Sequence, residues 1–455
     1  TSIVTDGSLQ LAAGNDITIR QAEVKAGGDL IAAAGHDLDV TSVLGESTTT
    51  TDQTREGKTK VTTTTTTQDL DQQALTAGGN LILSAGNDVN LVAAKLDAGK
   101  GLAVVAGNDI NSTTLTTVDS SDTLETRKRF KQTTSTTDET VHGTEFSAGS
   151  DIAMQAGHDI NLTAAQVYSE TGGVALTAGN DVNLLAAQEQ HDAEQDMQKK
   201  KKGFLSSKTT TTHDEWHDSF AVGTSLSGDT VQIKAGNDIA VVGSTVLADN
   251  DARLVAGHDI IIESAQDQSS EEHSSSQKKS GFSGSLSGGV ASVGYGKSRS
   301  SSDTATETTT QVASAVGSQH GNLLISAGDQ LTIAASDVAA GENLTLAAKD
   351  IALLAGQDTT DTQSSQSSKS SGFSVGLTYD PAAAFRSARS STTDNMPDSG
   401  STMGKISRRA EGDMAGTAAA TTAVVIQAGA HRSNDAQNDS TSDARVSQLS
   451  AGGNL

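Results

Sequence analysis

The first residues that could do chemistry are aspartates that recur two positions after a glycine. Asp16, Asp37, Asp88 and Asp109 follow this rule, and further copies continue along the chain. If the repeats stack, these carboxylates form a column that could bind calcium, which prefers oxygen ligands. Alternatively, each Asp accepts hydrogen bonds from N–H groups of the turn. We favour this structural role, because each repeat supplies one Asp and lacks the paired glycines of nonapeptide calcium repeats.

Three histidines lie immediately before this Asp. His36, His158 and His258 stand where other repeats have Asn, as at Asn15 and Asn87. A metal site needs several ligands that converge on one point, whereas exchange with Asn is typical of a turn residue. We therefore assign these histidines to turns.

The densest polar cluster consists of His213, Glu215, Trp216, His217 and Asp218. Imidazole and carboxylate groups so close together could form a metal or glycan site. Because no second cluster is seen to face it, we favour an exposed leg of a hairpin. Accordingly, we predict no catalytic residue, no cofactor and no metal ion for this chain.

Short runs of Lys beside Phe form the last candidate, on a chain whose net charge is −25. They could bind anionic lipopolysaccharide or lipid headgroups. Lys also protects the edges of exposed hairpins against aggregation, and the sequence leaves both roles open. The candidate surface-contact residues are Lys199, Lys200, Lys201, Lys202, Phe204, Lys278, Lys279, Phe282 and Phe373.

One repeated unit must position all these residues, and it is clearest at residues 85–91, Ala-Gly-Asn-Asp-Val-Asn-Leu. Gly and Asn are typical of a tight corner, and Val89 and Leu91 would point to one face of a short strand. We expect a positive φ at the glycine, so Gly86→Val should destabilise the fold more than any substitution in residues 62–67, by about 1–3 kcal/mol. The structural corners are Gly14, Gly35, Gly86, Gly107, Gly157, Gly179, Gly236 and Gly257.

The spacing of the corners predicts the fold. Gly14 and Gly35 lie 21 residues apart, and a weaker corner such as Gly27 divides the period. Three short strands and three corners fit into one period. We therefore predict an all-β chain that forms a right-handed parallel β-helix, whose coils stack at about 4.8 Å. One interior column should contain Ile17, Leu38, Val89, Ile110, Ile160 and Val182.

The coils come in pairs, separated by insertions rich in Thr and Ser. Thr favours strands, and a Gly lies near the centre of the first insertion and of the Lys–Phe runs, so we predict a β-hairpin arm after every second coil. The arms fall near residues 46–73, 113–146, 188–226, 264–319 and 359–450. We divide this single repeat array into modules 1–76, 77–147, 148–226, 227–319 and 320–450, with 451–455 opening a sixth.

Two features of the arms carry further expectations. The segments 220–226 and 373–379 alternate apolar and polar residues, but they are shorter than membrane strands, which need about 9–11 residues. We therefore expect them to pack on the stack of coils, here called the stem. In the fifth arm, the Ala-rich residues 411–429 predict a short helix, and residues 431–447 resemble a solvated loop.

Composition narrows the function. The acidic charge argues against nucleic acid as a partner. The absence of Cys excludes disulfides, thiol catalysis and zinc–thiolate sites. The sequence contains no run of eighteen apolar residues, so we predict no transmembrane helix. The chain starts at Thr1 and ends on the opening of a repeat, so we expect a segment of a longer protein.

Paired coils of the form Ala-Gly-x-Asp-Ile/Leu/Val and arms with a Lys-x-x-Gly-Phe centre resemble the haemagglutinin repeats of filamentous-haemagglutinin-type exoproteins. This family includes the contact-dependent growth-inhibition proteins, and the likeness is strongest in residues 1–358. The resemblance implies a structural stalk or adhesion segment of a secreted protein at the bacterial cell surface. It also implies an outer-membrane two-partner-secretion transporter, and a receptor, membrane or lipopolysaccharide on a target cell. The intact protein could deliver a C-terminal toxin to neighbouring bacteria.

Two other functions compete with this one. Polysaccharide lyases and hydrolases also use parallel β-helices, but they need a cleft with convergent acids and aromatics, and Trp216 is the sole Trp. Ice binding needs Thr on every coil, whereas the Thr runs at 62–67 and 209–212 lie in insertions. We therefore expect a non-enzymatic segment whose arms, including residues 199–204 and 278–282, contact a cell or membrane surface.

Overall fold

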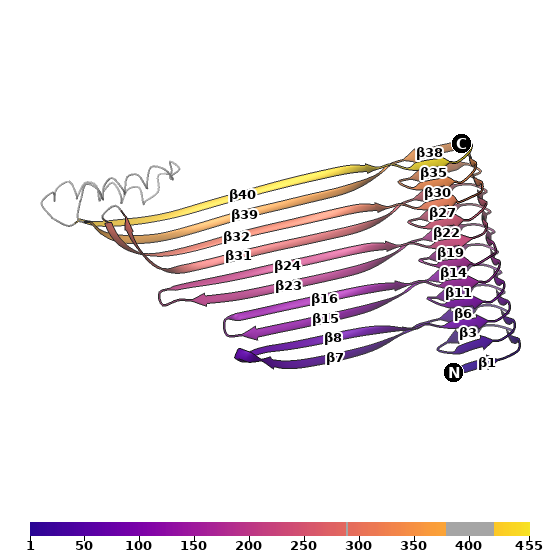
Figure 1. Ribbon diagram of the computed structural model, residues 1–455, viewed down its shortest axis with the longest axis horizontal. Helices are drawn as coiled ribbons and strands as arrows, with labels where there is room; N and C mark the ends of the chain where they lie inside the picture. The colour runs from indigo at the N-terminus through magenta and orange to yellow at the C-terminus, as the bar shows by residue number, and fades with distance from the viewer. Residues whose placement is uncertain (288–289, 379–422) are drawn as a thin grey trace.

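The computed structural model describes residues 1–287, 290–378 and 423–455, and it consists almost entirely of strands. Each coil of the stem contributes one strand to each of three parallel sheets (Figure 1). The first sheet contains β1 (Ser2–Thr5), β4 (Glu23–Ala26), β9 (Ala74–Ala77), β12 (Lys95–Ala98), β17 (Glu145–Ala148), β20 (Gln166–Ser169), β25 (Ser225–Gly228), β28 (Thr245–Ala248), β33 (Ala315–Ser318), β36 (Asp337–Ala340) and β41 (Gln448–Ala451).

The other two stem sheets flank the Ala-Gly-x-Asp corner. The second, before the corner, contains β2 (Leu9–Ala13), β5 (Leu30–Ala34), β10 (Leu81–Ala85), β13 (Leu102–Ala106), β18 (Ile152–Ala156), β21 (Val174–Ala178), β26 (Val231–Ala235), β29 (Ala252–Ala256), β34 (Leu323–Ser326) and β37 (Leu344–Ala347). The third, after the corner, contains β3 (Ile17–Arg20), β6 (Leu38–Thr41), β11 (Val89–Val92), β14 (Ile110–Thr113), β19 (Ile160–Thr163), β22 (Val182–Leu185), β27 (Ile239–Val242), β30 (Ile260–Glu263), β35 (Gln330–Ala334) and β38 (Asp350–Leu354).

The core of the stem consists of aliphatic side chains that alternate with outward polar ones. The column predicted from Ile17 to Val182 pairs in register along the third sheet. Its members are fully buried except Ile17 in the first coil, which is partly buried. The parallel β-helix and its interior column are therefore confirmed. Each fully buried Leu or Ile contributes about 1.5–3 kcal/mol, so every coil stabilises its neighbours.

The corner glycines are needed for a reason other than the one expected. None of the eight has a φ in the left-handed range. Instead, a Cβ at Gly86 would overlap the carbonyl oxygen of Gly35, one coil earlier, and a Cβ at Gly107 would overlap that of Gly86. The expected positive φ is thus wrong. Glycine is required because successive backbones approach too closely at this corner for any side chain.

In the coils that carry no arm, one residue after the third-sheet strand has a positive φ, in the left-handed region. These coils leave the third sheet through one such residue and re-enter the stem at once. A non-glycine residue there costs roughly 1–2 kcal/mol, so the turn is held by the strands on either side. The residues are Gln21 (φ 49°), Ala93 (φ 47°), Ala164 (φ 48°), Gly243 (φ 56°) and Ala335 (φ 46°).

The other coils send out the predicted hairpin arms, and all five arms leave the same side of the stem (Figure 1). The arms join edge to edge into one ten-stranded antiparallel sheet, here called the arm sheet. Its strands are β7 (Val43–Arg55), β8 (Thr59–Asp71), β15 (Leu115–Arg127), β16 (Phe130–His142), β23 (Ala187–Lys202), β24 (Ser206–Val222), β31 (Ala265–Ser287), β32 (Val290–Val312), β39 (Gly356–Thr378) and β40 (Ala423–Arg445), and the 3-10 helix η1 (Glu56–Lys58) closes the first arm.

The spacing of the coils explains why the arms pair. Arms leave the stem two coils apart, which is about 9.6 Å at the usual spacing of paired strands. A hairpin is two strands wide, so it occupies about the same 9.6 Å. Neighbouring arms therefore meet at hydrogen-bonding distance, and Thr63 of the first arm pairs with Thr123 of the second. This continuous sheet was not anticipated from the sequence.

Three expectations about the arms are wrong. The alternating apolar residues 373–378 lie in β39 at the outer end of the arm sheet, far from the stem on which we expected them to pack (Figure 1). Phe220 also lies in the arm sheet, whereas Leu226 belongs to the stem core. Residues 431–445 form the strand β40 rather than a loop, because they pair with β39. Within the expected helix, residues 423–429 are also strand, and 411–422 lie outside the described residues.

Buried hydroxyl groups hold the chain where arms return to the stem. Thr224 Oγ1 donates to the carbonyl oxygens of Leu162 (3.0 Å) or Leu185 (2.9 Å). Ser314 Oγ does the same for Glu263 O at 2.6 Å. Two of these carbonyl groups also accept a backbone N–H, Leu185 O from Ala164 and Glu263 O from Gly243. As acceptors, Thr224 Oγ1 binds the N–H of Ala165 (3.2 Å) and Ser314 Oγ binds the N–H of Ser244 (3.1 Å). Without the hydroxyls, these N–H groups would be buried without partners. The hydroxyls satisfy them.

We expect Gly86→Ala to lower the stability of the stem by about 1–3 kcal/mol, because the new methyl group forces adjacent coils apart. Gly14 is the matched control, since it lies at the same corner but has no atom within 4 Å of a Cβ position. Thermal unfolding followed by circular dichroism measures both variants. Equal melting temperatures for the two would contradict this role of the corner glycines.

Thr224→Val should cost about 1–3 kcal/mol, because it leaves the buried N–H of Ala165 without an acceptor. Thr211→Val, in the exposed arm sheet, removes one hydroxyl at a half-buried position and serves as the control. Chemical denaturation reports both. A Thr224 variant as stable as the Thr211 variant would show that the junction does not depend on this hydroxyl.

Candidate functional site

The corner aspartates form the predicted column, and they join each coil to the next. The N–H of Asp88 donates to Asp37 Oδ1 (3.2 Å), and the N–H of Asp109 donates to Asp88 Oδ1 (3.0 Å). Asn87 Nδ2 also donates to Asp37 Oδ1 (2.9 Å). These bonds, that of Asn87 first, lower the pKa of the Asp37 carboxyl. The structural role predicted for the Asp column is confirmed.

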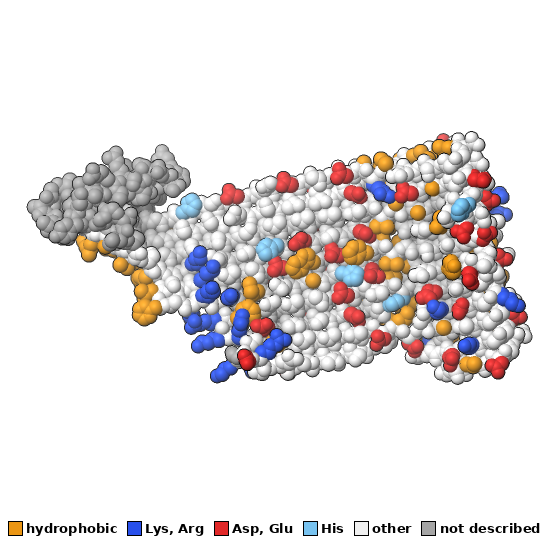
Figure 2. Space-filling view, viewed as in Figure 1, with side chains coloured by type: hydrophobic (Ala, Val, Ile, Leu, Met, Phe, Trp, Pro, Cys, Tyr) orange, Lys and Arg blue, Asp and Glu red, His pale blue; other side chains and the backbone are white. Residues whose placement is uncertain are grey.

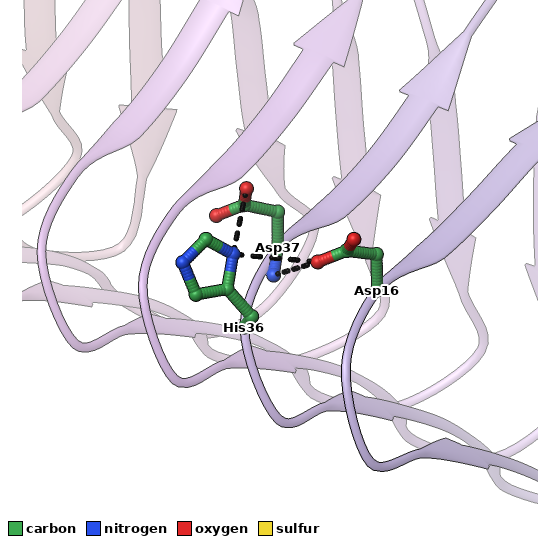
Figure 3. A group of neighbouring side chains, drawn as sticks. All are labelled: Asp16, His36 and Asp37. Carbon is green, nitrogen blue, oxygen red and sulfur yellow. Dashed lines mark hydrogen bonds and ion pairs between the residues drawn. The ribbon is translucent and has the colours of Figure 1, made fainter.

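The three corner histidines replace Asn in this ladder. His36 lies between Asp16 and Asp37 (Figure 3), with Nδ1 3.3 Å from Asp16 Oδ1 and 2.9 Å from Asp37 Oδ2. Asp16 Oδ1 also accepts the N–H of Asp37 at 3.1 Å. His158 and His258 repeat the arrangement. These trios contain metal-ligating groups, but in each the preceding Asp is already bonded to the next coil.

Cross-strand pairing in the arm sheet places distant residues in rows that share a face. One row, here called the basic row, runs through Lys200, Thr209, Lys278, Arg299, Lys369 and Arg432. Four of its cations are direct neighbours. In the four rows through residues 199–202, the described residues include no carboxylate. Like charges side by side are destabilising, so the basic row favours an anionic partner.

Beyond the basic row, the same face of the sheet becomes apolar. Four rows farther from the stem, Phe282, Tyr295 and Phe373 form an aromatic row. The rings of Phe282 and Tyr295 lie 5.1 Å apart. Val375 and Ile426 continue this face outward. Phe373 is 54% exposed and Ile426 is 72% exposed. Figure 2 shows the sequence of zones, with Lys and Arg gathered near the outer end and hydrophobic side chains beyond.

A row of glycines separates the cations from the apolar end. Gly281, Gly296, Gly372 and Gly429 pair directly across four strands. They leave an open hollow of about 550 Å³, whose lining includes Lys279. Because successive side chains of a strand point to opposite faces, Lys279 projects from the face opposite to Lys278 and Phe282. The glycine row therefore exposes backbone between the basic row and the aromatic row.

The predicted surface-contact residues all lie at this end of the arm sheet. Lys199 to Lys202 end β23, and Phe204 in the turn that follows is 100% exposed. Lys278 and Lys279 lie in the interior of the sheet, paired on both sides, so protection of a hairpin edge does not account for them. Sequence reasoning missed Arg299 and Arg432. The pairing register of the hairpins was the only signal that could have found them.

The cluster predicted around His213 and His217 lies in the middle of the arm sheet, among other carboxylates. His217 Nδ1 is 2.7 Å from Asp192 Oδ1, and its Nε2 is 2.7 Å from Glu215 Oε1. His213 Nδ1 is 3.0 Å from Asp196 Oδ1. The expectation that nothing faces this cluster is wrong, because β23 supplies Asp192 and Asp196 directly across the hairpin. Trp216 and Asp218 share the strand, and Trp216 projects to the opposite face.

These contacts shift the pKa values of the cluster. The hydrogen bond to Asp192, supported by Glu215, raises the pKa of His217. The hydrogen bond to Asp196 raises the pKa of His213. In return, His217 and then His213 lower the pKa of Glu215. The cluster thus favours protonated imidazole rings and ionised carboxylates.

The fold and its surface define a class of protein: a long repeat scaffold that presents one flat sheet of arms. The chain belongs to the hemagglutinin repeat family, which matches residues 53–128, 125–212, 203–316 and 293–403. The first match runs from the tip of the first arm to the tip of the second. It therefore contains the returning strand of one arm, two coils and the outgoing strand of the next arm. The resemblance predicted from the sequence is confirmed.

Several curated relatives carry the same repeats. The tRNA nuclease CdiA of Escherichia coli (strain STEC_O31) is 30% identical over 470 residues, covering 100% of this chain and 14% of the relative. The deoxyribonuclease CdiA of Dickeya dadantii (strain 3937) is 32% identical over 389 residues, covering 85% and 11%. The tRNA nuclease CdiA-2 of Burkholderia pseudomallei (strain 1026b) is 29% identical over 399 residues, covering 83% and 13%.

The chain therefore spans 11–14% of the length of these relatives. The nuclease activities in their names are those of the whole proteins, of which this chain matches a repeat segment. No solved structure matches the chain significantly. Across the described residues, no helix is long and apolar enough to cross a membrane.

The shifted pKa values predict how the stability of the arm sheet depends on pH. A raised histidine pKa gives stability that is complete below the ordinary value of 6.5 and is lost as the pH rises through the folded value. The lowered pKa of Glu215 gives stability above 4.5 that is lost as the pH falls. We expect the arm sheet to be most stable near pH 5–6. Trp216, the only Trp, reports its unfolding by fluorescence, and greater stability at pH 8 than at pH 6 would contradict this account.

Proposed function

We propose that this chain is a structural cell-contact segment of a large exoprotein, in which the stem is a spacer and the arm sheet makes the contact. The observation that carries the proposal is the basic row followed by exposed apolar rows on one face of the arm sheet. The partner is the anionic lipid surface of a target cell. Residues 199–204 and 278–282 are among the contacting parts.

The chemistry of the outer end supports a lipid partner. A membrane interface offers phosphate groups above an apolar phase, and aromatic side chains favour the boundary between them. The arm sheet presents the same order: Lys278 and Arg299, then the ring of Phe373, then Val375 and Ile426. Basic residues near an anionic membrane each contribute about 1 kcal/mol. The four adjacent cations of the basic row would add to one another.

The stem suits the role of a spacer. Each coil repeats nearly the same surface, so the stem offers little by which to distinguish partners. Arms that project from a rigid scaffold are where binding residues usually lie. The family adds the setting: secretion through an outer-membrane two-partner-secretion transporter, and presentation at the bacterial cell surface, as in contact-dependent growth-inhibition proteins. Delivery of a toxin would belong to the intact protein.

Binding to lipid vesicles tests the proposal. The chain should bind vesicles of phosphatidylcholine with phosphatidylglycerol, and bind vesicles of phosphatidylcholine alone much more weakly. The binding should weaken as salt is added, because exposed charges are screened beyond about 8 Å at physiological ionic strength. Co-sedimentation measures both effects. Equal binding to neutral and anionic vesicles would contradict the role of the basic row.

Two four-site variants separate the basic row from net charge. Changing Lys278, Arg299, Lys369 and Arg432 to Gln should reduce vesicle binding at least about a hundredfold, from about 1 kcal/mol per cation. The matched control changes four exposed cations of the stem to Gln, which alters the net charge equally; these are Lys25, Lys100, Lys234 and Arg253. If the control loses as much affinity as the arm variant, or if the chain binds intact target cells but no vesicle, the lipid partner is wrong.

A further inference from the structure

A second arrangement of charges on the arm sheet lies closer to the stem than the basic row and is independent of it. Three pairs follow one another on one face of the hairpin β23–β24: Asp192 with His217, Glu194 with Glu215, and Asp196 with His213. Glu272 of β31 lies beside Glu215. No Lys or Arg occurs among the described residues in the rows of these three pairs. Figure 2 shows histidines among carboxylates on this sheet.

This arrangement has no Lys or Arg to offset its carboxylates. Glu194, Glu215 and Glu272 are direct cross-strand neighbours, and adjacent like charges are destabilising. His213 and His217 each have both ring nitrogens within 3.3 Å of a carboxylate oxygen. A neutral imidazole has one N–H, so one contact of each ring then brings two lone pairs together. Either protons or a bound cation must relieve this.

One trio in the cluster has the geometry for a cation. His213 Nδ1 lies 3.0 Å from Asp196 Oδ1 and 3.8 Å from Glu194 Oε1, and one ligand atom from each of the three falls within 4.8 Å of the others. Ligand atoms around a tetrahedral zinc ion, bound at about 2.0–2.2 Å, lie roughly 3.4 Å apart. An ion among these atoms therefore needs only small side-chain movements. One imidazole with two carboxylates suits zinc, nickel or copper.

The corner trios offer the same groups but differ in one respect. There, an Asp oxygen also accepts an inter-coil N–H, as Asp109 Oδ1 does from Asp159 at 2.9 Å. Among the described residues, the hydrogen bonds recorded for Asp196 and Glu215 come from imidazole rings. Moving Asp196 or Glu194 onto an ion therefore breaks no backbone ladder.

We propose that Glu194, Asp196 and His213 form a binding site for one divalent transition-metal ion of the zinc type. The ion joins β23 to β24, and it neutralises the row of glutamates that faces it. Its remaining coordination positions are open to water, since Glu194 and Asp196 are exposed. The site stiffens the arm sheet between the stem and its outer end.

Isothermal titration of the chain with ZnCl₂ at pH 7.5 tests the site. We expect one saturable ion per chain, and a rise in the temperature at which Trp216 fluorescence reports unfolding of the arm sheet. His213→Gln and Glu194→Gln should each weaken binding at least about tenfold, since changes even around a ligand cost about 10–100-fold. Two variants lack this effect if the site is right: His191→Gln, whose ring lies on the other face of the sheet beside Asp138, and His158→Gln at a stem corner.

Three results would overturn the proposal. The first is no saturable binding of Zn²⁺ by the folded chain. The second is a loss of binding in the His158 or His191 variant as large as in the His213 variant, which would place the ion elsewhere. The third is an unfolding temperature that rises as the pH falls but does not respond to Zn²⁺ at pH 7.5, which would show that protons alone relieve the cluster.

Discussion

The structure depends on the in-register stacking of one coil on the next. At every Ala-Gly-x-Asp corner after the first, the backbones approach so closely that only glycine fits, as Gly86 does on Gly35. The next residues then lock the stack, because an Asp oxygen accepts both the N–H and the Asn side chain of the following coil. This stacking fixes the rise per coil at the spacing of paired strands, about 4.8 Å. Everything that the arms do follows from that spacing.

An arm after every second coil matches the width of a hairpin, so neighbouring arms pair over much of their length, as residues 60–66 do with residues 120–126. Sheets usually bury at least one face, but this one is a single layer of mostly polar side chains. Thr and Ser hydroxyls pair across its strands, for example Thr306 with Thr362 and Ser301 with Ser367. The stem supplies the register that a hydrophobic face would otherwise supply. The side chains of the sheet can then differ from zone to zone. Carboxylates and imidazoles lie in its middle, cations follow, and apolar residues lie at its outer end.

Much of this could be predicted from the sequence, because the signals are local. The distance from Gly14 to Gly35 and the alternation at Ile17 and Ile19 define a coil, and the Thr-rich insertions define arms. What could not be predicted depends on pairing between segments far apart in sequence. Lys278 and Arg299 become neighbours only through the register of a long hairpin. The strand β40 forms only because β39 offers it an edge, although its own composition indicates a loop.

Local reasoning also misjudged two physical causes. Gly86 was assigned a positive φ, since turns are the usual reason for glycine, whereas the close approach of another coil is the cause. The cluster at His213 was considered unpartnered, since Asp196 lies on the preceding strand and faces it only after the hairpin closes. Both errors concern contacts between repeats or strands, which composition and spacing do not encode. For the arm sheet, these contacts are set by the register in which neighbouring arms pair.

Paired cysteines measure that register directly, because the natural chain contains no Cys. Ser301 of β32 and Ser367 of β39 belong to different arms, and their Oγ atoms lie 2.9 Å apart. The variant Ser301→Cys with Ser367→Cys should form a disulfide under mild oxidation, which mass spectrometry of the digested protein detects. Ser301→Cys with Ser364→Cys should not, since Ser364 pairs three rows away with Thr304. Equal cross-linking of both variants, or none in a chain whose stem is folded, would contradict a continuous arm sheet.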